Sequence, residues 1–258
     1  MTPATDRFTH AIVRRPGPDL VDGITSGTRE QVDPARALNQ HDAYVAALRR
    51  LGLAVTILPP LPGHPDACFV EDTAVVVAGG AVVTRPGAEA RRGETSTVAQ
   101  ALAHHHEPEF MTSPATLDGG DVLIVGDRGW IGLSQRTNTA GADMLTSALA
   151  LLGITMTAVT VDAGLHLKSS VNWVGEGTLL ITEDFADNPA FAGLKCLVVP
   201  TTEAYACNTL LINGTLLTPV GFPDTRDLLR KLDCPVMELE TDEFRRVDGG
   251  LTCLSLRW

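Results

Sequence analysis

Residues 122–133 read VLIVGDRGWIGL, two apolar runs that meet at a Gly-Asp-Arg-Gly turn. Short apolar runs that are joined by a glycine turn are typical of a β-hairpin. A helical pattern follows over residues 137–152, and a further strand is indicated over residues 154–161 (ITMTAVTV). This stretch therefore predicts a hairpin, a helix and a third strand in that order, which is a ββαβ unit.

The same order recurs along the 258-residue chain. Further hairpins are predicted at 75–84 (VVVAGGAVVT), 171–182 (VNWVGEGTLLIT) and 209–218 (TLLINGTLLT), helices at 89–104, 186–193 and 223–232, and strands at 195–200 and 235–240. Asn213-Gly214 in the last hairpin is a strong two-residue turn signal. Repetition of one unit along a chain indicates an architecture in which neighbouring units pack against each other.

The beginning of the chain predicts a fifth unit that lacks half of its hairpin. Asp33-Pro34 combines a helix cap with proline at the first helical position. Gly52 ends that helix before the strand LAVTILPP (53–60). The missing strand has to come from elsewhere in the chain.

The C-terminal segment LTCLSLRW (251–258) can supply that strand by pairing with FTHAIVRR (8–15). The chain ends would then close a ring of five α/β units of about 50 residues each. The alternative is a single mixed sheet that is covered by helices on one or both faces. We favour the ring because the order recurs regularly and because closure removes exposed sheet edges. No linker marks a boundary, so residues 1–258 are expected to form one domain.

Composition excludes several classes of protein. The net charge of −11 and the pI of about 5.0 argue against nucleic acid or an anionic membrane as a partner. Residues 1–15 have no apolar core of signal-peptide length, and no apolar run reaches the ~20 residues of a membrane span. The five cysteines are an odd number without CxxC spacing, which indicates reduced thiols in a cytoplasmic protein instead of disulfides or a zinc site.

Two residues have the chemistry of a nucleophile and its proton carrier. Cys253 lies in DGGLTCLSL beside a glycine pair that allows close approach of a ligand, although most cysteines are simply buried. His166 in DAGLHLKSS can act as general acid and base near neutral pH, although a core histidine is the more common role. The triplet at residues 104–106 (HHH) is interpreted as a solvated helix end, because consecutive helical residues point in different directions and cannot share a metal.

Several carboxylates lie next to predicted strands. Asp118 and Asp121 in TLDGGDVLIVG are suited to orienting a histidine, accepting a guanidinium or capping a turn, and the local sequence does not choose between these roles. Asp66, Glu71 and Asp72 form an acidic cluster in PDACFVEDTAVVV. A charge beside an apolar strand is costly unless a cation pairs with it, and a planar guanidinium fits carboxylates well.

Two arginines close the second strands of hairpins, Arg85 in VVTRPGAE and Arg136 in GLSQRTN. Either can hold the α-carboxylate of a small molecule, and surface pairing is the alternative.

Together, these segments resemble the dimethylarginine dimethylaminohydrolases. The resemblance is carried, in chain order, by FTHAIVRRP, LVDGITSG, FVEDTAVV, VVTRPGAEARRGE, LDGGDVLIVG, GLSQRTNTAGA, LHLKSS and VDGGLTCLSL. It runs from about residue 7 to the C-terminus. It implies a five-bladed α/β propeller, the pentein fold, made of pseudo-repeated ββαβ units. This fold agrees with the ring that the repeat pattern predicts.

The resemblance also implies roles for individual residues. Cys253 would be the nucleophile, His166 the general acid and base, and Asp118 the carboxylate that orients His166, at a position where some members have Glu. The guanidinium would be bound by Asp72 with support from Glu71 and Asp66, and the amino-acid end by Arg85, Arg136 and the backbones of Ile24 and Val247. Ile24 stands where relatives often have Leu, in a loop that is expected to be mobile.

The implied reaction is hydrolysis of dimethylarginine, and of monomethylarginine, to citrulline and an amine through a covalent thiouronium on Cys253. No metal or organic cofactor is implied, the partner is a small methylated arginine, and a homodimer is left open. An arginine deiminase normally carries an added helical domain, and amidinotransferases are longer, so both fit this chain less well. A catalytically dead arginine-binding protein would have lost Cys253, His166 or the acidic cluster, and all are present.

Overall fold

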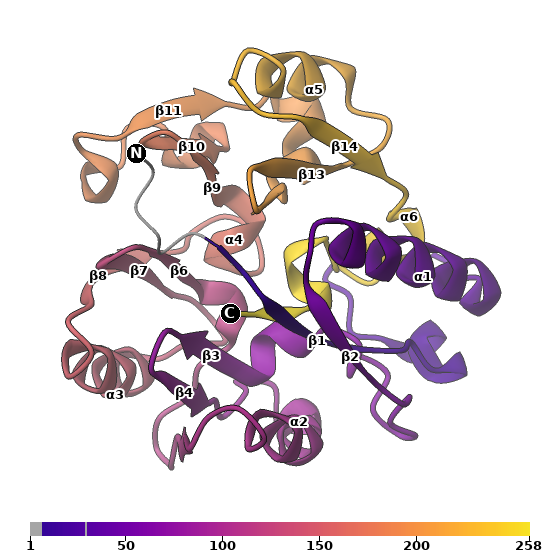
Figure 1. Cartoon of the computed structure of the whole chain (residues 1–258), viewed down its shortest axis with the longest axis vertical. Coiled ribbons are helices and arrows are strands. Elements are labelled where there is room, and N and C mark those ends of the chain that lie inside the picture. Colours follow the sequence, from indigo (N-terminus) through magenta and orange to yellow (C-terminus); the bar gives the residue numbers. More distant parts are fainter. Residues whose placement is uncertain (1–6, 29) are drawn as a thin grey trace.

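The structure, a computed structural model, describes residues 7–28 and 30–258. Its strands form five three-stranded sheets around a central axis (Figure 1). The sheets are β15 (Leu256–Arg257), β1 (His10–Arg14) and β2 (Ala54–Leu58); β3 (Ala74–Val77), β4 (Gly80–Val83) and β5 (Pro108–Phe110); β6 (Val122–Val125), β7 (Arg128–Leu133) and β8 (Thr155–Thr160); β9 (Val171–Gly175), β10 (Thr178–Ile181) and β11 (Lys195–Val198); and β12 (Leu210–Ile212), β13 (Thr215–Pro219) and β14 (Val236–Leu239). The predicted ring of five units is confirmed, and the single mixed sheet is not formed.

Each sheet has the same pairing. The middle strand runs antiparallel to the strand nearest the axis and parallel to the outer strand. An antiparallel neighbour needs only a tight turn, whereas a parallel neighbour needs a crossover. The ββαβ order therefore follows directly from the alternation of short turns and longer helical connections.

The two ends of the chain share one blade, as predicted. Ile12 of β1 pairs with Leu256 of β15, and the backbone carbonyl of Trp258 accepts hydrogen bonds from the N–H groups of Thr9 and His10. The first six residues, which belong to the predicted domain and to the signal-peptide argument, lie outside the described residues. Backbone hydrogen bonds between the chain ends thus complete the ring.

The hairpin turn at Asn213-Gly214 is also confirmed. Both residues have positive φ angles, +47° and +82°, as a two-residue turn between twisted strands requires. Asn213 additionally accepts a hydrogen bond from the backbone of Phe8 and so ties this turn to the first blade.

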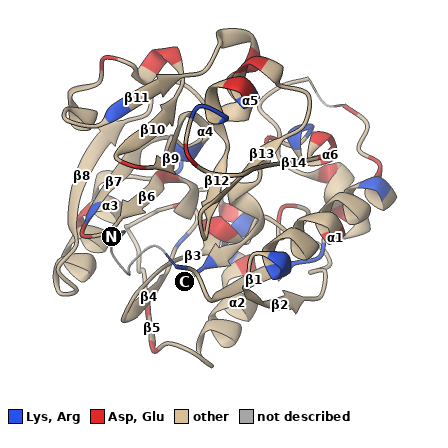
Figure 2. Ribbon diagram, turned by 45° about the horizontal axis from the view of Figure 1, so that its top comes forward, with Lys and Arg blue, Asp and Glu red and all other residues tan. Residues whose placement is uncertain are grey.

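The helices are α1 (Pro34–Arg50), α2 (Thr95–Leu102), α3 (Thr139–Ala150), α4 (Leu167–Ser170), α5 (Pro223–Leu229) and α6 (Asp242–Arg245). The carboxylate of Asp33 caps α1 by accepting the N–H groups of Ala35 and Arg36, as the sequence predicts. None of the described helices is long and apolar enough to cross a membrane. Lys and Arg residues are interspersed with Asp and Glu around the blades (Figure 2).

Two features of the elements differ from the prediction. The helix expected over residues 186–193 is replaced by two short 3-10 turns, Glu183–Phe185 and Pro189–Phe191. Pro189 has no N–H to continue a helix, and Gly193 turns the chain with a φ of +86°. The strand β5 was not predicted, because three residues that begin with proline give almost no strand signal.

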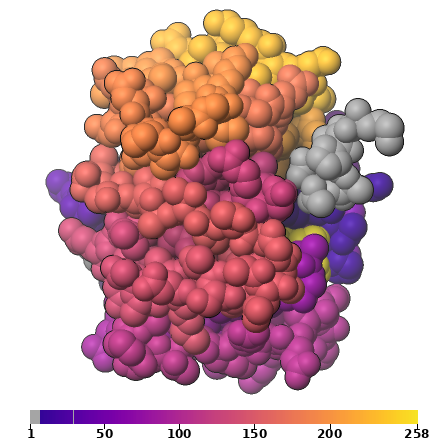
Figure 3. All heavy atoms as spheres, turned by 90° about the vertical axis from the view of Figure 1, so that its left-hand side faces the viewer, coloured from indigo at the N-terminus to yellow at the C-terminus, as the bar shows by residue number. Residues whose placement is uncertain are grey.

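The apolar core is divided among the interfaces between blades. Five separate clusters of buried side chains join neighbouring sheets, and one of them packs Trp130 of β7 against Leu179 of β10 and Phe191. A side view shows consecutive parts of the chain lying next to one another (Figure 3). Because the core lies between blades, the axis remains available for polar residues.

Candidate active site

Five short helical segments precede the five inner strands. They are η3 (Val70–Thr73), η5 (Gly119–Asp121), α4, η8 (Thr201–Cys207) and η9 (Thr252–Leu254), which lead into β3, β6, β9, β12 and β15. The segment η3 contacts η5 and η9, and α4 contacts η5 and η8. The repeat therefore brings equivalent positions of different blades together around one end of the axis.

A cavity lies among these segments. Seven of the ten predicted site residues line it, namely Ile24, Asp66, Asp72, Arg136, His166, Val247 and Cys253. Asp118 lies directly behind His166 and contacts its ring. Glu71 and Arg85 do not line the cavity, and their roles in substrate binding remain predictions.

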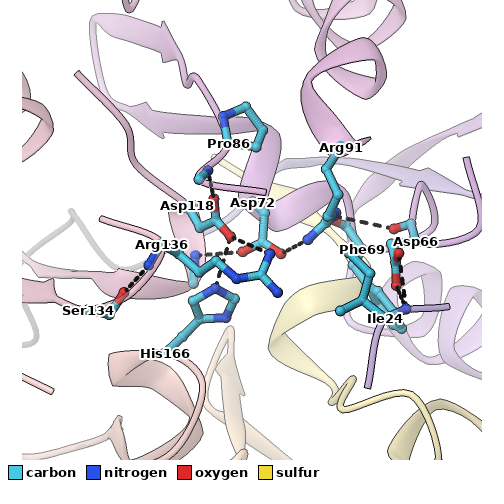
Figure 4. Close-up of polar contacts among 12 residues, drawn as sticks. Ile24, Asp66, Phe69, Asp72, Pro86, Arg91, Asp118, Ser134, Arg136 and His166 are labelled. Atoms are coloured by element: carbon cyan, nitrogen blue, oxygen red, sulfur yellow. Dashed lines mark hydrogen bonds and ion pairs between the residues drawn. The ribbon is translucent and has the colours of Figure 1, made fainter. Parts of the chain in front are cut away.

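His166 and Asp118 form a buried hydrogen-bonded pair (Figure 4). The imidazole Nε2 lies 3.0 Å from Asp118 Oδ2, and Asp118 Oδ1 accepts the N–H of Gly87 at 2.9 Å. Burial alone would lower the pKa of His166, but the charge of Asp72, the hydrogen bond with Asp118 and the charge of Asp121 raise it to about 9. His166 is therefore an imidazolium at neutral pH.

Asp121 fixes the position of His166 through the backbone. Its Oδ1 accepts the N–H of Leu167, at the start of α4, at 2.9 Å. Its Oδ2 accepts the hydroxyl groups of Ser134 and Thr137, both at 2.6 Å. Of the roles considered for Asp121, the structure therefore shows the turn-capping one.

Cys253 lies in η9 and lines the same cavity, and its N–H donates to the carbonyl of Gly250. Burial, followed by the negative charges of Glu71 and Asp72, raises the pKa of the Cys253 thiol to about 12. This raised pKa favours the neutral thiol over the thiolate at neutral pH. A cation placed beside Cys253 would favour the thiolate.

Asp72 is the carboxylate that is most completely fixed in the cavity wall. Its Oδ1 accepts the N–H of Gly120 at 2.9 Å, and its Oδ2 accepts Arg91 Nη1 at 2.5 Å. Ligand atoms of Asp72, Asp118 and His166 lie within 4.8 Å of one another, and this is the one group of such residues in the described part of the chain that could hold a metal ion. Arg91 already supplies the positive charge beside Asp72 that a metal ion would supply.

Glu71 is the neighbour of Asp72 but is directed elsewhere. Its Oε1 pairs with Lys168 Nζ at 2.7 Å and with Arg257 Nη2 at 2.8 Å. These three residues line a second cavity of about 850 Å³ between the inner strands. Glu71 is therefore held by two cations away from the cavity that Asp72 lines, and its supporting role in guanidinium binding remains a prediction.

Arg91 lines the cavity, whereas Arg85 does not. The guanidinium of Arg85 donates to the carbonyl of Ala115 at 3.3 Å, and the backbone carbonyl of Arg85 accepts a hydrogen bond from the N–H of Leu117. The 3-10 helix η4 (Glu89–Glu94) instead turns Arg91 inward. The sequence VVTRPGAEARRGE offers three arginines, and only the path of the backbone after β4 decides which one reaches the cavity.

The loop that carries Ile24 closes the cavity. The N–H of Ile24 donates to the Asp66 carboxylate at 3.0 Å, and the N–H of Ser26 donates to Asp248 at 2.5 Å. The space that remains is about 20 Å³, which is room for one water molecule. The predicted mobility of this loop remains a prediction.

Gly120 is a position where a small change should disturb the site. A Cβ atom there would lie 2.7 Å from His166 Nδ1 and 2.9 Å from Asp72 Oδ1, closer than atoms normally pack. We expect Gly120→Ala to lower kcat/KM for the natural substrate roughly 100-fold, because displacement of catalytic groups by about 1 Å has effects of that order. Gly126→Ala, in the same blade, is the control. A Cβ atom at Gly126 would meet no atom within 4 Å, but the φ angle there is +60°. This variant should therefore lower the stability of the fold and leave kcat/KM unchanged.

A blade order of ββαβ and a cavity with a cysteine, a histidine and several carboxylates define the class of the protein, which is a hydrolase of the pentein fold. A family model described as N,N dimethylarginine dimethylhydrolase, eukaryotic, matches residues 24–191 of this chain. The Pseudomonas aeruginosa protein N(G),N(G)-dimethylarginine dimethylaminohydrolase is 38% identical to this chain over 97% of this chain and 100% of its own length. The chain belongs to the dimethylarginine dimethylaminohydrolase family.

Other relatives agree with this assignment. A Streptomyces coelicolor protein of the same name is 40% identical over 96% of both chains. A solved structure of a mutant of the P. aeruginosa enzyme in complex with citrulline superposes with a TM-score of 0.96 at 37% identity, covering 98% of this chain and all of that one. The N-terminal domain of ArgZ, a cyanobacterial arginine dihydrolase, superposes with a TM-score of 0.87 at 18% identity and 98% and 97% coverage, which shows a shared fold.

Proposed function

We propose that this protein hydrolyses Nω,Nω-dimethyl-L-arginine to L-citrulline and dimethylamine, and monomethylarginine to citrulline and methylamine. The observation that carries the proposal is that a buried thiol, an imidazolium and the Asp72 carboxylate line one cavity in a member of this family. The thiol and imidazole belong to different blades and meet only in the folded ring.

In the first step, the guanidinium of the substrate binds beside Asp72 and its positive charge lowers the pKa of the Cys253 thiol, whose proton passes to solvent water and is later taken up by the released dimethylamine. The thiolate attacks the central guanidinium carbon and forms the S–C bond of a tetrahedral adduct. The imidazolium of His166, held by Asp118, donates a proton to the dimethyl-substituted nitrogen, and the C–N bond breaks to release dimethylamine. An amine leaves poorly without that proton, so a histidine that is protonated at neutral pH is suited to this step.

In the second step, a thiouronium remains on Cys253. The imidazole of His166 is now neutral and takes a proton from water, which attacks the same carbon. The S–C bond breaks, citrulline leaves, and the thiol regains its proton. One water molecule is consumed and every group of the protein returns to its starting state.

The cationic residues of the cavity bind the other end of the substrate in this proposal. Arg136 and Arg91 line the cavity and are suited to the α-carboxylate. The backbones of Ile24 and Val247 are suited to the α-amino group, and Asp66 holds the Ile24 loop over it.

We expect Asp72→Asn to weaken substrate binding. The neutral amide keeps the shape of the carboxylate but loses the charge that attracts a guanidinium, so KM should rise roughly 10- to 100-fold, which corresponds to loss of a charged hydrogen bond. Asp143→Asn on the exposed face of α3 is the control. Initial rates over a range of dimethylarginine concentrations test this, and an unchanged kcat/KM would refute a guanidinium-binding role for Asp72.

The function itself is tested by citrulline release from the purified protein, with asymmetric dimethylarginine and arginine compared in the presence of a chelator. Turnover of dimethylarginine alone supports the proposal and a reaction that needs no added metal. Turnover of arginine would identify a deiminase instead, and turnover of neither would indicate another guanidine substrate or a binding role. A cytoplasmic location, which the five free cysteines support, and a homodimer remain predictions for fractionation and light scattering.

A further inference from the structure

Glu94 is a buried carboxylate with no part in the reaction described above. It lies at the end of η4, where α2 begins, and only 1% of it is exposed. Its two oxygens accept Arg91 Nε at 3.1 and 3.2 Å, and Oε2 also accepts Arg91 Nη2 at 2.9 Å. The pair is therefore side-on, an arrangement that fixes the plane of the guanidinium as well as its position.

Arg91 uses nearly all of its hydrogen-bonding capacity within the protein. Its Nη2 donates to the carbonyl of Phe69 at 3.0 Å and to that of Asp66 at 3.3 Å, in addition to Glu94. Its Nη1 donates to Asp72 Oδ2. A guanidinium has five N–H groups, and among the described residues only one, the second on Nη1, has no acceptor. Arg91 lines the cavity, so that N–H is available to a molecule bound there.

The same contacts connect Glu94 to Asp72. Asp72 is held on one side by the N–H of Gly120 and on the other by Arg91 (Figure 4). Without Glu94, Nε would lose its acceptor and Nη2 would keep only the carbonyls of Phe69 and Asp66. The plane of the guanidinium would then be less firmly fixed, and with it the direction of the contact to Asp72. The orientation of both cavity-facing groups thus depends on a carboxylate that does not reach the cavity.

We propose that Glu94 is a positioning residue for this reaction: it fixes the plane of Arg91, and through Arg91 it fixes Asp72, so that both are preorganised for the substrate. The consequence for the reaction rests on the proposed function, whereas the orientation of Arg91 does not. Preorganisation lowers the cost of ordering side chains when a ligand binds. Loss of Glu94 should therefore raise KM more than it lowers kcat.

The charge state of Glu94 sets the conditions for the test. Burial, opposed by Arg91, raises the pKa of Glu94 to about 7, so its charge is complete above that pH and is lost below it. The titratable groups around it are Arg14, Asp66, Cys68, Asp72 and Arg91. A neutral replacement should differ from the natural residue at pH 8.5 and resemble it at pH 5.5.

The experiment compares Glu94→Gln, Glu94→Asp and Glu89→Gln. Glu89 lies in the same 3-10 helix, its side chain is 90% exposed, and it pairs only loosely with Arg92 at 3.5 Å, which makes it the matched control. At pH 8.5 we expect Glu94→Gln to raise KM for dimethylarginine about 10- to 100-fold with kcat within about threefold. Glu94→Asp should raise KM less than Glu94→Gln does, and Glu89→Gln should have the KM of the natural protein.

A second readout needs no substrate. The Nε–H of Arg91 should give a slowly exchanging proton resonance in nitrogen-edited NMR spectra of the natural protein and of Glu89→Gln. That resonance should be lost in Glu94→Gln. If Glu94→Gln does not fold, two measurements still test the proposal. One is the KM of Glu94→Asp. The other is the spectrum of the natural protein between pH 8.5 and 5.5, in which the Nε–H signal of Arg91 should weaken as Glu94 is protonated.

The outcomes are distinguishable. A KM for Glu94→Gln that equals that of Glu89→Gln at pH 8.5, or a protected Nε–H that persists without Glu94, overturns the proposal. Failure of the natural protein to turn over dimethylarginine overturns the proposed function instead, and the NMR signal then still reports whether Glu94 fixes Arg91.

Discussion

Cys253→Ser should abolish citrulline formation while the protein remains folded. A serine hydroxyl is a far weaker nucleophile than a thiolate, and the positive charge of a bound guanidinium that ionises Cys253 cannot ionise a hydroxyl to a useful extent. We expect kcat to fall by roughly 10³-fold or more, which corresponds to about 4 kcal/mol of transition-state stabilisation. The steady-state rate with dimethylarginine measures this directly.

The replacement is nearly isosteric, so the thermal unfolding midpoint should change little. Cys196→Ser is the control, since Cys196 is a half-buried cysteine of β11 that lies outside the cavity. It should keep full activity. Normal turnover by the Cys253 variant would remove Cys253 from the reaction, and another nucleophile would have to be sought among the cavity residues.

His166→Gln should lower kcat by roughly 10³-fold, within the range observed for loss of a general acid and base. The leaving amine would have no proton donor, and water would have no base in the second step. His104→Gln, an exposed histidine at the end of α2, is the control and should be neutral. If the glutamine variant kept the kcat of the natural protein, a residue other than His166 would have to transfer the proton.

The same histidine predicts a pH dependence. Because the pKa of His166 is raised to about 9 from an ordinary 6.5, the imidazolium required for amine departure is present below about pH 9 and is lost above it. The rate of the first chemical step should therefore fall above pH 9.

The raised pKa also means that His166 stabilises the fold fully below pH 6.5, and that this contribution disappears as the pH rises through 9. Both effects should be missing in His166→Gln, as stopped-flow rates and unfolding midpoints across pH 6 to 10 would show.

Much of the architecture could be predicted from the sequence because its signals are local. A hairpin turn such as Asn213-Gly214 and a cap such as Asp33-Pro34 depend on neighbouring residues only, and the order of hairpin, helix and strand then repeats along the chain. The segment 186–193 shows the limit of such signals, since its apolar residues pack between blades although the backbone forms only short turns.

The ring of ββαβ units could be predicted from the sequence alone. The family resemblance pointed to seven of the residues that line the cavity, Cys253 and His166 among them. Three features depend on the packing of the blades and could not be predicted: Arg91 and not Arg85 lines the cavity, Glu71 pairs with Lys168, and Glu94 holds Arg91. The physical reason is that the direction of a side chain in a short 3-10 turn is set by how the blades pack around it. Such turns have no periodic pattern of their own from which that direction can be read.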